Sequence, residues 1–142
     1  MQDLQVEPLD IKYLSLYEAW FDQRAANYSL FKQSKLQDIS SHNSWAWAGR
    51  IANEVVAVAL FHLDDMRKGR LNIAVKPSER RHGIGAKLTD LILKEPALKN
   101  STSIFVSVEP ENIAGQKILV KNGFSKVDFN EEGLIDFVKQ KF

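Results

Sequence analysis

The residues best placed to do chemistry in this chain lie between Arg80 and Gly85, where the sequence reads R-R-H-G-I-G. Two arginines can make charge-assisted hydrogen bonds to an anion. Two glycines let the main chain approach that anion closely, because no side chain holds it off. An apolar helical pattern follows at once, and the first amides of a helix are unpaired and partially positive. The segment predicts a phosphate-binding helix N-terminus, although a plain turn with solvated arginines would use the same residue types.

Two familiar phosphate loops do not fit this segment. A Walker loop requires Lys and then Ser or Thr directly after its last glycine, whereas Gly85 is followed by Ala86, Lys87 and Leu88. A dinucleotide fingerprint requires a third glycine where Leu88 stands. The motif is therefore neither a nucleoside-triphosphate loop nor a dinucleotide fingerprint.

Seven strands are predicted around the motif. They cover "LQVEPLD" up to Pro8, "SWAWAGR" and "NEVVAVALFHLDD" joined as a hairpin near "RIAN", "GRLNIAVKP", "SIFVSVE", and a last hairpin of "SKVDF" and "LIDFVKQKF" through "NEEG". The segment Val55–Leu63 is apolar on both faces, which is typical of a central strand.

Four helices are predicted between these strands. The first, "IKYLSLYEAWFDQRAANY", begins after Asp10 as N-cap and places Leu14, Tyr17, Phe21 and Ala25 at α-helical spacing. A shorter one is expected around "SKLQDISSHN". The helix after the motif ends before Pro96, and the helix in "ENIAGQKILVKNGF" closes at Gly123. The order β-α-α-β-β-β-α-β-α-β-β predicts one α/β (α+β) domain over residues 1–142, with helices packed on a mixed β-sheet.

The composition excludes several classes of protein. The chain has no cysteine, which excludes disulfides, thiolate metal sites and a cysteine nucleophile. Its three histidines lack metal-ligand spacing, so no metal is expected. The net charge of +1 and the lack of interleaved aromatic and basic residues argue against nucleic acid. Without a signal peptide or a membrane-length apolar run, a cytoplasmic protein with no membrane partner is expected.

Several segments together resemble the GNAT superfamily of N-acetyltransferases. "V-x-P" at Val75–Pro77 followed by "R-x-x-G-x-G" at Arg80–Gly85 is similar to the acetyl-coenzyme-A (acetyl-CoA) signature of that family. Downstream, Asn112 and the pair Gly123 and Phe124 resemble its second motif, an Asn that opens a helix ending in Gly-Phe. R-x-x-G-x-G alone is a weak signal. The combination, with the order of elements over the whole chain, is specific.

The resemblance implies that acetyl-CoA binds between two central parallel strands that splay apart, Arg70–Lys76 and Ser101–Glu109. The pantetheine arm would pair with backbone near Ile73 and Val75, and Asn112 would contact it from the other side. The pyrophosphate would bind the segment that follows Arg80, whose charge would assist. That segment comprises Arg81, His82, Gly83, Ile84, Gly85 and Ala86.

The implied reaction is direct transfer of an acetyl group to an amine. Relatives often carry Tyr seven residues after the motif asparagine, where this chain has Leu119, and some place Glu five residues before it, where this chain has Ser107. Glu109 is the candidate catalytic base, and its structural alternative is a cap before Pro110. His62 ends a central strand and could face the acceptor, although a core histidine is the alternative.

The acceptor is expected to be a small-molecule or peptide amine. The candidates to line its site are Trp20, Gln23, Arg24, Tyr28, Trp45 and Trp47. Because the acid and base are not obvious, a non-catalytic acyl-CoA-binding module is the alternative function. A homodimer that pairs the C-terminal hairpins is possible.

Overall fold

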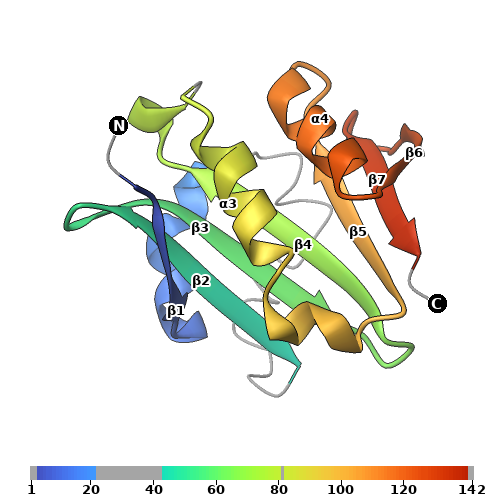
Figure 1. Cartoon of the computed structure of the whole chain (residues 1–142), viewed down its shortest axis with the longest axis horizontal. Helices are drawn as coiled ribbons and strands as arrows, with labels where there is room; N and C mark the ends of the chain where they lie inside the picture. Colours follow the sequence, from blue (N-terminus) through green and yellow to red (C-terminus); the bar gives the residue numbers. More distant parts are fainter. Residues whose placement is uncertain (1–2, 22–42, 81, 141–142) are drawn as a thin grey trace.

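The computed structural model describes residues 3–21, 43–80 and 82–140, which form a seven-stranded sheet in the order β1-β2-β3-β4-β5-β7-β6 (Figure 1). The strands are β1 Gln5–Leu9, β2 Ser44–Ile51, β3 Glu54–Leu63, β4 Lys68–Val75, β5 Ser103–Val108, β6 Ser125–Phe129 and β7 Ile135–Gln140. Among these pairs, β4 and β5 run parallel and the others antiparallel. The predicted mixed α+β fold is confirmed.

Helices cover both faces of the sheet. The two α-helices, α3 Ile84–Ile92 and α4 Ile113–Lys121, lie on one face, and the 3₁₀ helix η1 Ile11–Trp20 lies on the other (Figure 1). Two short 3₁₀ turns, η2 Pro77–Glu79 and η3 Pro96–Asn100, flank α3 along the chain. No helix in the described ranges is long and apolar enough to cross a membrane.

Two hydrophobic cores result from this arrangement, one on each face. The α-side core includes Leu71, Ile84, Leu88, Ile92, Ile104, Val106 and Leu119. The η1-side core consists of Leu14, Phe21, Ala46, Val58, Leu60 and Ala74. β3 serves both cores, since six consecutive residues from Val56 to Phe61 are buried. This confirms that β3 is a central strand.

The first helix is a 3₁₀ helix, which corrects the predicted α-helical spacing. A 3₁₀ helix has about three residues per turn, so side chains three positions apart share a face. Ile11, Leu14, Tyr17 and Trp20 have this spacing, and all four pack in or against the η1-side core. The helix ends where Phe21 becomes extended. The predicted continuation to Ala25 lies outside the described residues, as does nearly all of "SKLQDISSHN".

Most predicted boundaries are confirmed. Asp10 caps η1 by accepting a hydrogen bond from the Lys12 amide at 3.1 Å. The strand predicted to end at Pro8 runs one residue further, to Leu9, at the edge of the sheet where a missing N–H is tolerated. Gly123 adopts φ +89° directly after α4, as a left-handed helix end requires.

Candidate functional site

The parallel strands β4 and β5 separate halfway along their length. They pair from Lys68 with Ser103 to Leu71 with Val106, where the register ends. β4 then continues to Val75 and β5 to Val108 along diverging paths (Figure 1). This separation, called the opening below, leaves one edge of β4 without a partner strand.

Main-chain groups of β4 face the opening. The amide of Lys76 donates to the Val56 carbonyl at 2.8 Å, toward β3. Because backbone groups alternate sides along a strand, those of Ile73 and Val75 point the other way. Both residues are half-buried. An extended ligand could therefore pair with Ile73 and Val75, the two strand residues named from the sequence.

The N-terminus of α3 lacks a side-chain cap. Its N-cap residue, Gly83, has φ +79° and ψ 6°, and its carbonyl accepts the first intrahelical bond from the Lys87 amide at 3.0 Å. The amides of Ile84, Gly85 and Ala86 precede that bond, so they have no intrahelical acceptor. Such amides, with the helix dipole, favour an anion.

Gly85 brings this helix end against β4. A Cβ on Gly85 would lie 3.1 Å from the Val75 Cγ2 atom, so a side chain there would require Val75 or the helix to shift by a few tenths of an ångström. Gly83 has open space around its Cα but a left-handed backbone that favours glycine. The two glycines thus satisfy different requirements, and together they place the uncapped amides beside the opening.

The basic residues before α3 have distinct surroundings. Arg80 donates from Nη2 to the Trp20 carbonyl at 2.7 Å and from Nε to the Val75 carbonyl at 3.2 Å. It therefore ties the loop to η1 and β4. His82 is exposed, with Nδ1 at 3.7 Å from Glu79 Oε2. Arg81 lies outside the described residues.

The N-terminus of α4 is satisfied by its own chain, unlike that of α3. Asn112 is the N-cap, and its Oδ1 accepts from the Gly115 amide at 2.9 Å. A Cβ on Gly115 would lie 2.7 Å from Asn112 Nδ2, so glycine lets the cap fold over the helix. Asn112 is exposed beyond the end of β5.

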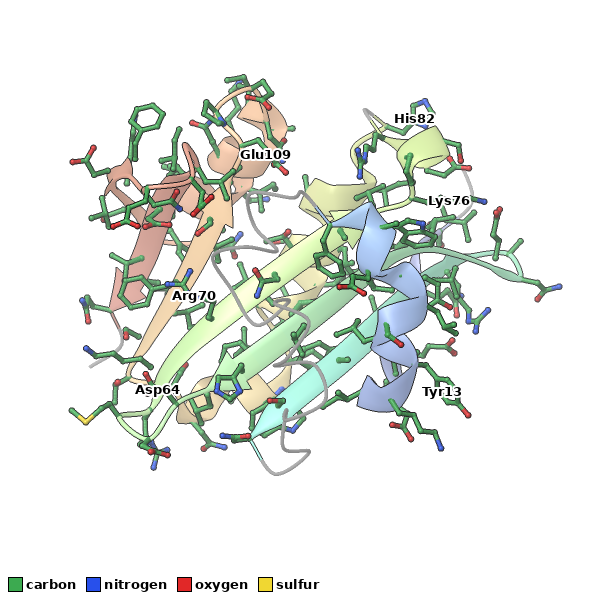
Figure 2. The ribbon with its side chains drawn as sticks, turned by 180° about the vertical axis from the view of Figure 1, so that it is seen from behind. Tyr13, Asp64, Arg70, Lys76, His82 and Glu109 are labelled. Carbon is green, nitrogen blue, oxygen red and sulfur yellow. The ribbon has the colours of Figure 1, made fainter. Side chains whose placement is uncertain are left out.

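The acid and base candidates lie at different depths. Glu109 is half-buried just after β5, and its carbonyl accepts from the Asn112 amide at 2.9 Å. Figure 2 shows Glu109 and His82 at the end of the sheet where β4 and β5 lie apart. Leu119 is 1% exposed within the α-side core, so it offers no proton there.

His62 has the environment of a structural histidine. Its Nδ1 lies 2.8 Å from Ser44 Oγ, and burial lowers the pKa of its imidazole. It pairs in register with Arg70, at the opposite end of β4 from Val75.

The predicted acceptor-lining aromatics are largely core residues. Trp45 and Trp47 belong to or pack against the α-side core, and Trp20 packs against the η1-side core. Gln23, Arg24 and Tyr28 lie outside the described residues.

A polar cluster at the opening was missed from the sequence. Ser107 Oγ donates to Asp136 Oδ1 at 2.6 Å, and Arg70 Nη1 donates to Ser107 Oγ at 3.4 Å. Asn72 lies two residues after Arg70, on the same face of β4. Its side chain is 7% exposed, and no described residue accepts a hydrogen bond from its Nδ2. The available signal was a polar residue between two apolar neighbours in each of three strands: "LNI", "VSV" and "IDF".

Comparisons with known proteins agree with this arrangement. A model of the acetyltransferase (GNAT) family matches residues 10–124, whereas no curated protein sequence matches significantly. The PaiA N-acetyltransferase of Thermoplasma acidophilum, solved with coenzyme A, has a TM-score of 0.65 at 14% identity, covering 99% of this chain and 100% of that one. The ribosomal-protein-S18-alanine N-acetyltransferase of Escherichia coli has a TM-score of 0.68 at 14% identity. The match covers 97% of this chain and 94% of that one. A Methanocaldococcus jannaschii domain has a TM-score of 0.68 at 17% identity. The match covers 99% of this chain and 100% of that one.

Proposed function

The chain belongs to the acetyltransferase (GNAT) family, and from this premise we propose that it transfers an acetyl group from acetyl-CoA directly to an amine. One observation carries the proposal: the uncapped N-terminus of α3 lies against the unpaired edge of β4, with Gly85 beside Val75. A diphosphate and an extended amide-containing arm are the two ligand groups that such a pair of surfaces fits.

The residues named from the sequence divide the cofactor between them. The amides of Ile84, Gly85 and Ala86 would hold the diphosphate, with His82 and Gly83 adjoining it, and Arg81 is proposed to assist on the sequence motif alone. Ile73 and Val75 would pair with the pantetheine arm, and Asn112 would border it from the β5 side. Arg80 acts on this site by fixing the Val75 carbonyl. When bound, acetyl-CoA supplies an acetyl group activated as a thioester.

Main-chain groups can polarise the acetyl carbonyl, which the direct transfer requires. A backbone N–H at the opening, near Val75, polarises the acetyl carbonyl because it is already oriented by the strand. Since Leu119 has a hydrocarbon side chain with no acidic proton, solvent protonates the departing thiolate, whose ordinary pKa of ~8.5 makes this feasible near neutral pH.

The acceptor is a small-molecule or peptide amine. A lysine amine with a pKa of ~10.4 costs about 4–5 kcal/mol to deprotonate at pH 7, whereas an α-amine near ~8 costs only about 1–1.5 kcal/mol. This difference favours an α-amine. The S18-alanine N-acetyltransferase of E. coli is named for an acceptor of that class.

Calorimetry with acetyl-CoA tests the cofactor site. The wild-type protein should bind at micromolar levels, and Gly85→Ala should weaken binding about tenfold, a loss of roughly 1.4 kcal/mol, because its Cβ displaces α3 from β4. The double variant Gly85→Ala/Val75→Ala removes the close contact and should recover most of the affinity. No wild-type binding at millimolar acetyl-CoA would refute the function.

A thiol-release assay then separates an enzyme from a binding module. The wild-type protein should release coenzyme A when acetyl-CoA is mixed with an amine panel. Binding without thiol release for any amine would instead support the non-catalytic module.

A further inference from the structure

Ser107 stands where β5 leaves β4, on the face of the sheet that η1 occupies. Along β5, Val106 and Val108 point into the α-side core. Side chains alternate along a strand, so Ser107 points to the opposite face. It is also the first β5 residue beyond the last β4–β5 pair, Leu71 with Val106. Its hydroxyl therefore borders the opening from the η1 side.

The Ser107 hydroxyl is held between a carboxylate and a cation. It donates to Asp136 Oδ1 at 2.6 Å and accepts from Arg70 Nη1 at 3.4 Å. The same Asp136 oxygen accepts from Asn130 Nδ2 at 3.1 Å, which orients the carboxylate. A hydroxyl carries one proton and two acceptor lone pairs. Ser107 Oγ can thus accept one more hydrogen bond while its own proton is donated to Asp136.

A buried donor faces the same place from the other strand. Because Leu71 pairs with Val106, the next residue on each strand is Asn72 on β4 and Ser107 on β5. Asn72 is 7% exposed, and its Nδ2 has no acceptor among the described residues. Leaving such a donor buried and unpaired is unfavourable. A polar ligand at this point would satisfy it.

We propose that Ser107 is the catalytic residue that takes a proton from the acceptor amine, with Asp136 as the positioning residue that receives Ser107's own proton. The inference rests on the proposed function and specifies its base. Asp136 on β7 would act through the hydroxyl of Ser107 on β5. Ser107 stands five residues before Asn112, where some GNAT relatives carry Glu. Glu109, the base expected from the sequence, is the competing candidate.

The proton and electron changes balance in one transfer. The amine nitrogen forms a bond to the acetyl carbon, the carbon–sulfur bond breaks, and its electron pair leaves on sulfur. A nitrogen proton passes to Ser107 Oγ while the Ser107 proton moves to Asp136 Oδ1. Asp136 later releases that proton to solvent, and the thiolate takes one up. Acetyl-CoA and the amine yield the amide and free coenzyme A.

Charged and titratable groups lie close to the Ser107–Asp136 pair. Arg70 on β4 contacts Ser107, His62 on β3 pairs in register with Arg70, and Asp128 on β6 pairs in register with Asp136.

The test measures thiol release with glycinamide, n-butylamine and spermidine as acceptors, from pH 6 to 9.5. Ser107→Ala and Asp136→Asn should each lower kcat about 10²-fold at pH 7, with acetyl-CoA affinity within twofold of wild type. With glycinamide the loss should shrink toward pH 9.5, because an α-amine with a pKa near ~8 is mostly neutral there, whereas n-butylamine and spermidine remain mostly protonated. The double variant Ser107→Glu/Asp136→Asn returns a carboxylate to the opening and should recover at least a tenth of the rate.

One control and one competing variant accompany these changes. Asp128→Asn removes a β6 carboxylate that pairs in register with Asp136, and it should keep kcat within threefold. Glu109→Gln removes the competing base, and a loss of kcat as large as that of Ser107→Ala would overturn the relay. If Asp136→Asn keeps the wild-type kcat and pH profile, or if the wild type binds acetyl-CoA but turns over none of the three amines, the relay is overturned while the cofactor site stands. Failure of acetyl-CoA to bind would instead overturn the proposed function.

Discussion

Gly83 and Gly85 show how identical residues two positions apart meet different physical requirements. Gly83 is needed for its left-handed backbone, φ +79°, with open space around it. Gly85 is needed because Val75 Cγ2 lies 3.1 Å from where a Cβ would be. A motif that predicts anion binding is therefore partly a packing device, which aligns the α3 amides with the β4 edge.

Arg80 is expected to contribute to stability more than its place in an anion motif suggests. Arg80→Ala removes two bonds to backbone carbonyls, at Val75 and Trp20. At about 1 kcal/mol for the exposed pair of bonds, the melting temperature should fall by roughly 3–5 °C. Lys87→Ala, which removes a positive charge from the first turn of α3, should shift it by less than 1 °C. Equal melting temperatures for both variants would contradict this role.

His62 makes the folded protein sensitive to mild acid. Burial holds the pKa of its imidazole below the ordinary value of about 6.5. The unfolded chain then binds a proton that the folded chain resists, so stability is complete above about pH 6.5 and declines as the pH falls toward the lower folded pKa.

Urea unfolding at pH 7.5 and 5.5 measures this effect. The wild-type midpoint should be lower at pH 5.5, and His62→Gln, which does not titrate, should reduce the difference. His82→Gln changes an exposed histidine and should leave the difference unaltered. An undiminished difference in His62→Gln would show that other groups cause it.

The two α-helices start in opposite ways, which assigns them different tasks. α4 is capped by its own Asn112, whose Oδ1 accepts from Gly115. α3 begins at a glycine with no side chain to accept from its first amides. One helix end is satisfied by its own side chain, and the other is uncapped, as the proposed diphosphate site requires.

The cap of α4 can be separated from any contact between Asn112 and the cofactor. Asn112→Ala should cost about 1 kcal/mol of unfolding free energy, as loss of an N-cap does, whereas Asn112→Ser should keep most of it. Chemical denaturation gives these values, and calorimetry gives acetyl-CoA affinity for the same variants. Stable Asn112→Ser with weakened binding would indicate that the amide group contacts the arm. Wild-type stability in Asn112→Ala would contradict the cap.

The sequence was most informative about elements with strong local signals. β3 reads as buried because both of its faces are apolar, and α4 ends at Gly123 because a left-handed position needs glycine. The geometry of η1 was less visible, since Ile11 and Leu14 fit a period of three as well as an α-helical one. The close approach of Gly85 to Val75 depends on tertiary packing, which no local pattern records.

At the scale of the whole molecule, the sheet contains one described parallel pair, and that pair is where it opens. The splay of β4 and β5 was implied by the resemblance to the GNAT superfamily, whereas the helix between them accounts only for their parallel direction. The Ser107–Asp136 pair was beyond such reasoning. It requires the register of β5 against β7, two strands separated in sequence by α4 and β6.

The most direct measurement follows the backbone amides by nuclear magnetic resonance during titration with coenzyme A. The largest shifts should fall on Ile84, Gly85 and Ala86 at the start of α3 and on Ile73 and Val75 along the opening. Amides at the far end of β4, near Lys68, should move little. Absence of shifts at millimolar coenzyme A, or shifts that bypass both the α3 N-terminus and the β4 edge, would contradict the account.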